Sequence, residues 1–271
     1  MAFLPVSKNA RDVGQCIYCD AFDEPLSTEH AVPYGLNGPW TLLRASCRRC
    51  ADITHRFERD SLRGLFPAIR AVLRMQTRRP GKRPRTLPLV VESRGVQRTV
   101  QVPLIDFPLY LPAPRWPQPG AVTGDSMAHA VSVKMDFIHV AGPSFDSVSH
   151  SYPDVDFVGS RLTFIPEEFA RTLAKIAFCA GVYTLGLAPL RQSPIRQIVL
   201  GKNRDVWHWV GLWTGDPINE PKGLHAMQVL TNGSDIHVIL RLFAQFGAPE
   251  YHIVLGAADP EFVRSDAWPW K

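Results

Sequence analysis

Two Cys-x-x-Cys pairs constrain the fold of this chain more than any other feature of the sequence. The pairs are Cys16/Cys19 and Cys47/Cys50, and residues 20–46 separate them. One such pair can bind one side of a tetrahedral zinc ion, and two pairs complete an all-sulfur site without an open position. The separation exceeds the roughly 15–20 residues of simple four-cysteine ribbons. We therefore expect a structural zinc that holds a longer working loop, with two unrelated redox or buried pairs as the alternative.

Length and cysteine usage indicate the class of protein. The fifth cysteine, Cys179, stands alone in an apolar, helix-like segment, where a free cysteine is commonly buried. Four paired thiols and one buried thiol fit metal binding in a reducing cytoplasm better than a disulfide framework. Residues 1–8 lack the pattern of a secretion signal. The chain also has no apolar run of roughly 18 residues or more, so no membrane span is predicted.

Positive charge is concentrated around and after the second cysteine pair. Residues 44–98 carry 15 Lys and Arg against 4 Asp and Glu, whereas the whole 271-residue chain has a net charge of only +5. Lysines and arginines grouped in this way displace counterions from a phosphate backbone. A solvated surface is the ordinary explanation of such a group, but these arginines adjoin a metal-ligand motif. We therefore expect a nucleic acid as the partner.

The first 77 residues read as a strand, a loop, a second strand and a helix. Residues 1–15 have no regular pattern and predict an irregular lead-in. Residues 26–32 and 40–45 can form strands on either side of a loop that contains Gly35, Gly38 and Pro39. After Cys50, apolar residues recur at helical spacing as far as Phe66, and Pro67 breaks this helix or starts another.

The rest of the chain predicts a separate α+β domain. Residues 78–86 are basic and almost free of apolar residues, and they read as a linker between a domain of residues 1–77 and one of residues 87–271. A helix is predicted to start at Pro166, whose ring suits a first turn. Pro108–Pro119 reads as an extended loop. Strands are predicted for residues 87–92, 97–105, 131–140, 195–200, 206–213, 224–230, 236–243 and 251–255, so the fold class is α+β with an antiparallel sheet and one long helix.

A segment near the start of the chain resembles the HNH endonucleases, which have the ββα-metal fold. The resemblance covers about residues 14–75 and rests on the two cysteine pairs, on Glu29-His30 followed by Pro33, on the Leu36–Gly38 loop and on the helix after Cys50. It implies hydrolysis of DNA phosphodiester bonds. His30 corresponds to the general base of the family, and a neutral imidazole is suited to that role near pH 7. Glu29 corresponds to the ligand of a catalytic divalent ion, Mg²⁺ or Mn²⁺.

The second ligand of the catalytic ion departs from the family pattern. Family members usually carry His or Asn directly after the last cysteine, where this chain has Ala51. His55, one helical turn further, and Asp52 are the candidates to replace it. A residue that orients the base is expected at Asn37 or Thr41, and Glu58 matches a glutamate that binds metal or supports the site in related sequences.

Each of these residues also has an ordinary structural role open to it. Glu29 and His30 could cap a helix or form a surface ion pair. His55 could simply face solvent, and Glu58 could pair with Arg59 or Arg63 on its own helix, which contributes only about 0.3 kcal/mol. The predicted contacts to nucleic acid are Arg48, Arg49, Arg56, Arg59, Arg63, Arg78, Arg79, Lys82, Arg83 and Arg85.

The C-terminal half carries no motif with assignable chemistry. Asn232-Gly233 predicts a two-residue hairpin in which Thr231 faces Ser234. In that register His225 and His237 are not partners, which argues against a simple metal pair. The strands also carry His208, His252 and a set of tryptophans, Trp207, Trp209 and Trp213, which read as core or interface.

Two functions from different classes follow from the sequence. The first is an HNH-type endonuclease in which a second domain selects a target or senses a partner, as in mobile-element or anti-phage nucleases. The second is a zinc-containing nucleic-acid-binding protein that has lost the catalytic metal site at Ala51. A protein-interaction module that binds an acidic partner is a third, more distant possibility.

Overall fold

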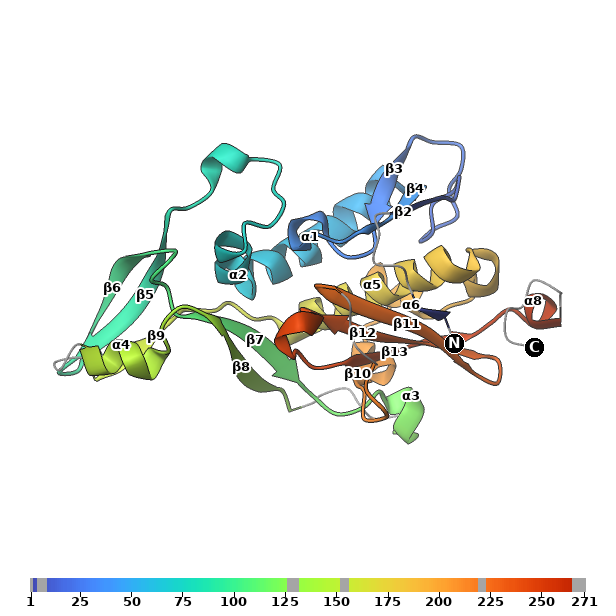
Figure 1. Ribbon diagram of the computed structural model, residues 1–271. Coiled ribbons are helices and arrows are strands. Elements are labelled where there is room, and N and C mark those ends of the chain that lie inside the picture. The colour runs from blue at the N-terminus through green and yellow to red at the C-terminus, as the bar shows by residue number, and fades with distance from the viewer. Residues whose placement is uncertain (1, 4–8, 126–131, 152–155, 219–222, 265–271) are drawn as a thin grey trace.

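Helix α5 (Pro166–Leu185) lies at the centre of the computed structural model, with other elements packed on two sides of it (Figure 1). The structure describes residues 2–3, 9–125, 132–151, 156–218 and 223–264. In the described residues the fold is a mixed α+β arrangement of helices and several small sheets, as the sequence predicts. Residues 9–72, which contain the two cysteine pairs and are called the zinc-pair region below, cover one side of α5. The C-terminal sheet covers the other side (Figure 1).

The sequence of α5 explains both its start and its burial. Pro166 occupies the first turn and Glu167 and Glu168 follow it, so the positive end of the helix faces two carboxylates. The helix ends at Gly186, whose φ of +88° is a backbone conformation that residues with a side chain rarely adopt. Most of its residues are buried around the whole circumference, as expected for a helix packed between two layers.

The region of the cysteine pairs forms a small three-stranded sheet with a helix after it. The strand order is β2-β4-β3, with β3 antiparallel and β2 parallel to the central β4. The strand–loop–strand–helix order predicted from the sequence is confirmed. The elements are β2 (Asn9–Asp12), β3 (Leu26–His30), the 3₁₀ turn η1 (Tyr34–Leu36), β4 (Trp40–Cys47), α1 (Arg48–Gly64) and α2 (Pro67–Val72).

The N-terminal residues are more regular than predicted. Residues 9–12 form β2 beside β4, and β1 (Ala2–Phe3) pairs with β11 in the C-terminal sheet. The expectation of an irregular lead-in is therefore wrong for these stretches. Both strands are too short to give a periodic pattern, and they form because partner strands offer unpaired edges.

Four strands of the C-terminal half and the N-terminal strand β1 form a five-stranded antiparallel sheet whose face packs on α5. Its order is β1-β11-β12-β13-β10. Consecutive hairpins give the β11-β12-β13 part of this order, and β10 closes the other edge. The strands are β10 (Val210–Leu212), β11 (His225–Asn232), β12 (Asp235–Leu242) and β13 (Tyr251–Ala257).

Two smaller sheets lie beyond α2 (Figure 1). One has the order β6-β5-β9 and its own apolar cluster around Leu87, Leu89 and Val91. The other pairs β7 with β8. Their strands are β5 (Thr86–Ser93), β6 (Val96–Pro103), β9 (Phe157–Gly159), β7 (Leu109–Arg115) and β8 (Lys134–Ala141), and the remaining short elements are η2 (Pro80–Lys82), α3 (Gly120–Thr123), α4 (Phe145–Ser151), η3 (Ala188–Leu190), α6 (Ile195–Val199), α7 (Val206–Trp209), η4 (Ala244–Phe246) and α8 (Pro260–Arg264).

The proline-rich segment is a strand rather than the predicted extended loop. β7 includes Pro112 and Pro114 and pairs with β8. Successive backbone N–H groups of a strand point to opposite edges, so prolines two residues apart lose donors on the same edge. Because β7 has only one partner strand, the prolines can face its unpaired edge. The predicted strand 131–140 corresponds to β8, and Val131 itself lies outside the described residues.

Two predicted strands of the C-terminal half are helical. Residues 195–199 form α6, and residues 206–209 form α7 before β10 begins. Their apolar, β-branched composition favoured strands, but both segments pack as short helices against α5. Tertiary packing therefore overrides the local preference.

The β11–β12 hairpin turns one residue later than predicted. Asn232 pairs with Asp235, so the two turn residues are Gly233 and Ser234 rather than Asn232 and Gly233. Gly233 has φ +62°, which suits a turn with glycine at its first central position. His225 lies opposite Leu242 and His237 opposite Leu230, so the two histidines are not partners, as expected.

The main apolar cluster extends over residues from both sides of the basic segment 78–86. It includes Cys47 and Phe57 from the first part of the chain and Phe169, Phe178 and Leu240 from the second. The predicted domain boundaries stay predictions, but α5 and the zinc-pair region share a continuous interior.

Candidate metal centre and nucleic-acid interface

The four paired cysteines come together as the sequence predicts. One sulfur from each of Cys16, Cys19, Cys47 and Cys50 lies within 4.8 Å of the others. The Cys19 and Cys47 sulfurs are 3.6 Å apart. Sulfur ligands about 2.3 Å from a tetrahedral zinc lie roughly 3.8 Å from one another, so the spacing fits this ion. The cluster can therefore hold a metal such as zinc.

Local backbone structure places the four sulfurs. The first pair lies in a turn closed by the Asp20 N–H donating to the Cys16 carbonyl, with Asp20 at φ +63°. Cys47 ends β4 and caps α1, and Cys50 lies in the first turn of α1. A hydrogen bond from Cys50 lowers the pKa of Cys16, which favours the thiolate form of this residue. The cluster thus joins the turn that contains Cys16 and Cys19 to the start of α1.

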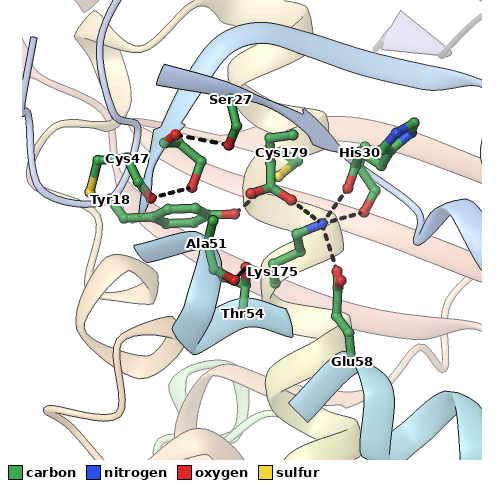
Figure 2. Close-up of polar contacts among 12 residues, drawn as sticks. Tyr18, Ser27, His30, Cys47, Ala51, Thr54, Glu58, Lys175 and Cys179 are labelled. Carbon is green, nitrogen blue, oxygen red and sulfur yellow. Dashed lines mark hydrogen bonds and ion pairs between the residues drawn. The ribbon is translucent and has the colours of Figure 1, made fainter. Parts of the chain in front are cut away.

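A buried lysine lies where the sequence predicts a catalytic metal. Lys175 of α5 has a fully buried side chain, and its ammonium lies 2.7 Å from Glu29 Oε1 and 2.7 Å from Glu58 Oε1 (Figure 2). The ammonium also donates to the main-chain carbonyl oxygens of His30 and, at 3.4 Å, of Ala31. Four oxygens therefore surround one nitrogen.

Opposite charges in this cluster hold the Lys175 side chain as an ammonium. Burial alone would lower the pKa of Lys175, but the carboxylates of Glu29 and Glu58 reverse that effect and raise it above its ordinary value. Burial raises the pKa of Glu58, against the opposing charge of Lys175. The ammonium is therefore the charged group that stabilises both carboxylates. A catalytic Mg²⁺ or Mn²⁺ on Glu29 does not fit this arrangement, because a cation of the protein already lies there.

The same buried region reaches the cysteine pair through Tyr18. This residue lies between Cys16 and Cys19, and its hydroxyl is 3.6 Å from the Cys179 sulfur on α5. Burial, followed by the neighbouring Cys179, raises the pKa of Tyr18 well above its ordinary value. Cys179 is buried, as expected from the sequence. Lys175 and Cys179 are one helical turn apart on α5, so both meet the zinc-pair region on one face.

His30 and Glu29 point in different directions. A register shift in β3 between Ser27 and Glu29 precedes the pair, and Glu29 is buried whereas His30 is half-buried. The His30 ring is directed away from the Lys175 ammonium and lies 5.6 Å from the Tyr34 ring (Figure 2). Burial, the ammonium of Lys175 and the charge of Arg78 lower the pKa of His30 against the opposing effect of Glu29. The imidazole is therefore neutral near pH 7.

The two candidates for the second metal ligand lie away from this cluster. Asp52 and His55 are both exposed on α1, whereas Glu58 turns inward to Lys175. Among the described residues, the four cysteines are the only group of three or more His, Cys, Asp and Glu whose ligand atoms lie within 4.8 Å. Glu29 and Glu58 are thus brought together, and Asp52 and His55 do not join them in a metal-ligand group.

The two candidates for orienting the base have different positions. Asn37 Oδ1 accepts a hydrogen bond of 2.7 Å from the Gln76 N–H, so it fastens the loop to the segment after α2. Thr41 lies directly opposite His30 in the β3–β4 ladder. Side chains of directly opposed residues share a face of a sheet, so Thr41 is the one beside His30. Gly38 packs so closely on the Val32 carbonyl that a Cβ would lie 2.2 Å from that oxygen.

Three arginines of α1 form an exposed row. Arg49, Arg56 and Arg63 are all exposed and follow one another at intervals of seven residues. Seven residues are close to two helical turns, so these side chains share one face about 10 Å apart. The other predicted nucleic-acid contacts are exposed at Arg48, Arg78, Arg79, Lys82 and Arg85 and half-buried at Arg59 and Arg83.

Two of the predicted contacts are engaged within the chain. Arg59 forms an ion pair of 3.1 Å with Asp60, and Arg83 donates to the Met75 carbonyl at 2.6 Å. They are therefore less available to an external phosphate than the exposed row. The exposed carboxylates of α1 are those of Asp52 and Asp60, because Glu58 turns inward. The exposed arginines of this helix outnumber them, so its outer surface is positive.

His225, His237 and His252 of the C-terminal sheet are buried or half-buried. His225 Nε2 donates to the Leu36 carbonyl at 2.7 Å, and its Nδ1 accepts from the Phe243 N–H at 3.2 Å. His237 Nδ1 and His252 Nε2 lie 2.9 Å apart on neighbouring strands. His208 and the buried Trp207 lie in α7 rather than in a strand. Burial lowers the pKa of His225 to about 4 and that of His252 to about 3, so both are neutral at pH 7.

The residue that sequence reasoning missed is Lys175. It is the one charged residue between Arg171 and Arg191, in a stretch that is otherwise apolar or uncharged. A lone charge on the buried face of a helix needs an opposite charge across the interface. That signal was available, but nothing in the sequence identifies Glu29 and Glu58 as the partners, which lie more than a hundred residues away.

Comparison of the chain with family models, with curated proteins and with solved structures finds no match. Within the described part of the chain, no helix combines the length and apolar character needed to cross a membrane. The functional conclusion therefore depends on the chemistry of the site alone.

Proposed function

We propose that this chain is a zinc-containing nucleic-acid-binding protein, built on an HNH-like unit whose metal position is filled by Lys175. The observation that carries the proposal is the exposed row Arg49, Arg56 and Arg63 on the helix that the cysteine cluster holds. A fixed row of guanidinium groups suits a phosphate backbone, because each can release a condensed counterion on binding. Double-stranded DNA is the proposed partner.

The proposed zinc supports this role indirectly. Bound to the four cysteines, it would fix the start of α1 against the turn that carries Tyr18, with no open position for catalysis. A helix held at its first turn presents its arginines in one orientation. Zinc is thus proposed to be structural, and the arginines are proposed to make the contacts.

Salt-dependent binding to a short DNA duplex tests the proposal. We expect the triple variant Arg49→Gln/Arg56→Gln/Arg63→Gln to bind more weakly, and the slope of log K against log salt to fall by about one for each lost phosphate contact. A matched control replaces three exposed arginines elsewhere, Arg98, Arg204 and Arg264, by glutamine. Equal losses in both variants would point to net charge alone, and no loss in the first would refute the interface.

A second candidate function is HNH-type hydrolysis, which the surroundings of His30 favour. Its imidazole is half-buried with a lowered pKa, and the charge of Arg78 acts on it. A neutral imidazole near a guanidinium can accept a proton beside a bound phosphate. Plasmid nicking with Mg²⁺ or Mn²⁺ distinguishes the two functions. Activity that His30→Ala abolishes supports the nuclease, and intact plasmid with both proteins supports binding alone.

A further inference from the structure

The oxygens around Lys175 form a cage of the kind that holds hard cations. Glu29 and Glu58 each supply a carboxylate oxygen at 2.7 Å, and the His30 and Ala31 carbonyls add two more. Carboxylate and main-chain carbonyl oxygens are the usual ligands of Mn²⁺, Mg²⁺ and Ca²⁺ in proteins. The cation at the centre of this cage is the ammonium of Lys175, whose side chain is fully buried.

We infer that Lys175 takes the place of a divalent cation, and that removing its ammonium turns the cage of Glu29, Glu58 and the two carbonyls into a divalent-cation site. A divalent ion would supply the missing charge in the space that the ammonium leaves. Lys175 belongs to α5 and reaches the cage because that helix packs on the zinc-pair region. This packing therefore determines that the cage holds an ammonium rather than a divalent ion.

The experiment compares two substitutions of the same residue. Lys175→Ala removes the ammonium and leaves space, whereas Lys175→Met removes the charge but fills the space. With Mn²⁺, Mg²⁺ and Ca²⁺ as probes, we expect the melting temperature of Lys175→Ala to rise by several degrees. Wild type and Lys175→Met should not respond. Calorimetric titration with Mn²⁺ should give one binding event in Lys175→Ala, beyond any zinc already bound.

A further variant assigns the ligands. Adding Glu58→Gln to Lys175→Ala should abolish or strongly weaken Mn²⁺ binding, because one of the two carboxylates is lost. Adding Asp52→Asn, on the exposed face of α1, should leave binding unchanged. Binding that survives Glu58→Gln, or an equal response of wild type and Lys175→Ala, would overturn the inference.

The outcome counts even if Lys175→Ala folds poorly. Refolding that needs Mn²⁺ supports the inference directly. If Lys175→Ala fails to fold at every cation concentration while Lys175→Met folds, a divalent ion cannot replace the ammonium and the inference is wrong. No nucleic acid enters these measurements, so their result is independent of whether the arginines of α1 bind DNA.

Discussion

The ammonium of Lys175 has four oxygen contacts, and its side chain is fully buried. Such a group is costly to bury alone and is stabilised only by its partners. The same holds for Glu29 and Glu58, which both lose the ammonium that they contact if Lys175 is removed. At the scale of single residues, the three side chains therefore act as one unit.

Lys175→Met is expected to lower the free energy of unfolding by about 3–5 kcal/mol, because it leaves two buried carboxylates without a counter-charge. The triple variant Lys175→Met/Glu29→Gln/Glu58→Gln should recover much of this loss, since the buried charges are then gone. Urea unfolding of the two variants measures both effects. An exposed control, Lys202→Met, should change stability little. If the triple variant is as unstable as the single one, lost packing rather than charge is responsible.

His225 predicts a dependence of stability on pH. Its Nδ1 accepts from the Phe243 N–H, so protonation there would set two donors against each other. The folded-state pKa is about 4, below the ordinary value of 6.5. The unfolded chain therefore binds a proton first, and stability is complete above pH 6.5 and falls as the pH drops towards 4, by up to ~1.4 kcal/mol per pH unit.

Urea unfolding at several pH values checks this prediction. The curve of stability against pH should be less steep for His225→Gln than for wild type by about one proton between pH 6.5 and 4. His55→Gln, at an exposed position on α1, serves as the control and should keep the wild-type slope. Equal slopes in all three proteins would show that His225 does not carry the dependence.

At the scale of elements, the cysteine cluster joins the first turn of the unit to α1. We expect one zinc per chain by elemental analysis, and loss of that zinc in Cys16→Ser or Cys50→Ser. Because structural zinc contributes directly to folding, these variants should also unfold far more easily. The change should appear first in β3, β4 and α1, as faster amide hydrogen exchange.

Cys179→Ser is the matched control for the zinc prediction. Cys179 is also a buried thiol but lies outside the cluster, next to Tyr18. It should keep its zinc even if stability changes. Zinc content that is unaffected by Cys16→Ser would mean that the four sulfurs do not form the site.

The elements of the zinc-pair region could be predicted because several signals agree there. Cysteine spacing, Pro33, the glycine loop and the helical pattern after Cys50 all indicate the same strand–loop–strand–helix order, which the structure has. Residues 195–199 gave only one signal, an apolar β-branched run, and packing against α5 makes them helical instead. The hairpin register depended on one dipeptide and shifted by a single residue.

The parts of the candidate site that could be predicted are those formed by contacts within the zinc-pair region. The cysteine cluster was predictable because spacing alone specifies it. The partner of Glu29 was not, because Lys175 meets it through tertiary packing of a helix far along the chain. Glu58 was identified as part of the site, but its partner is the ammonium rather than a metal ion or a neighbouring arginine.

At the scale of the whole molecule, α5 joins the zinc-pair region to the C-terminal sheet (Figure 1). On one side Lys175 enters the cage of Glu29 and Glu58, and on the other the helix packs on β11, β12 and β13. His225 adds a second link, from β11 to the loop at Leu36. The exposed arginine row of α1 takes no part in these contacts.

The proposed function is the binding of nucleic acid without a catalytic divalent ion. The most direct measurement follows a supercoiled plasmid and a labelled duplex with the wild-type protein, with and without added Mg²⁺ or Mn²⁺. We predict salt-sensitive binding that is the same in both conditions, and plasmid that stays supercoiled. Nicking that requires the added ion and is lost in His30→Ala would contradict it.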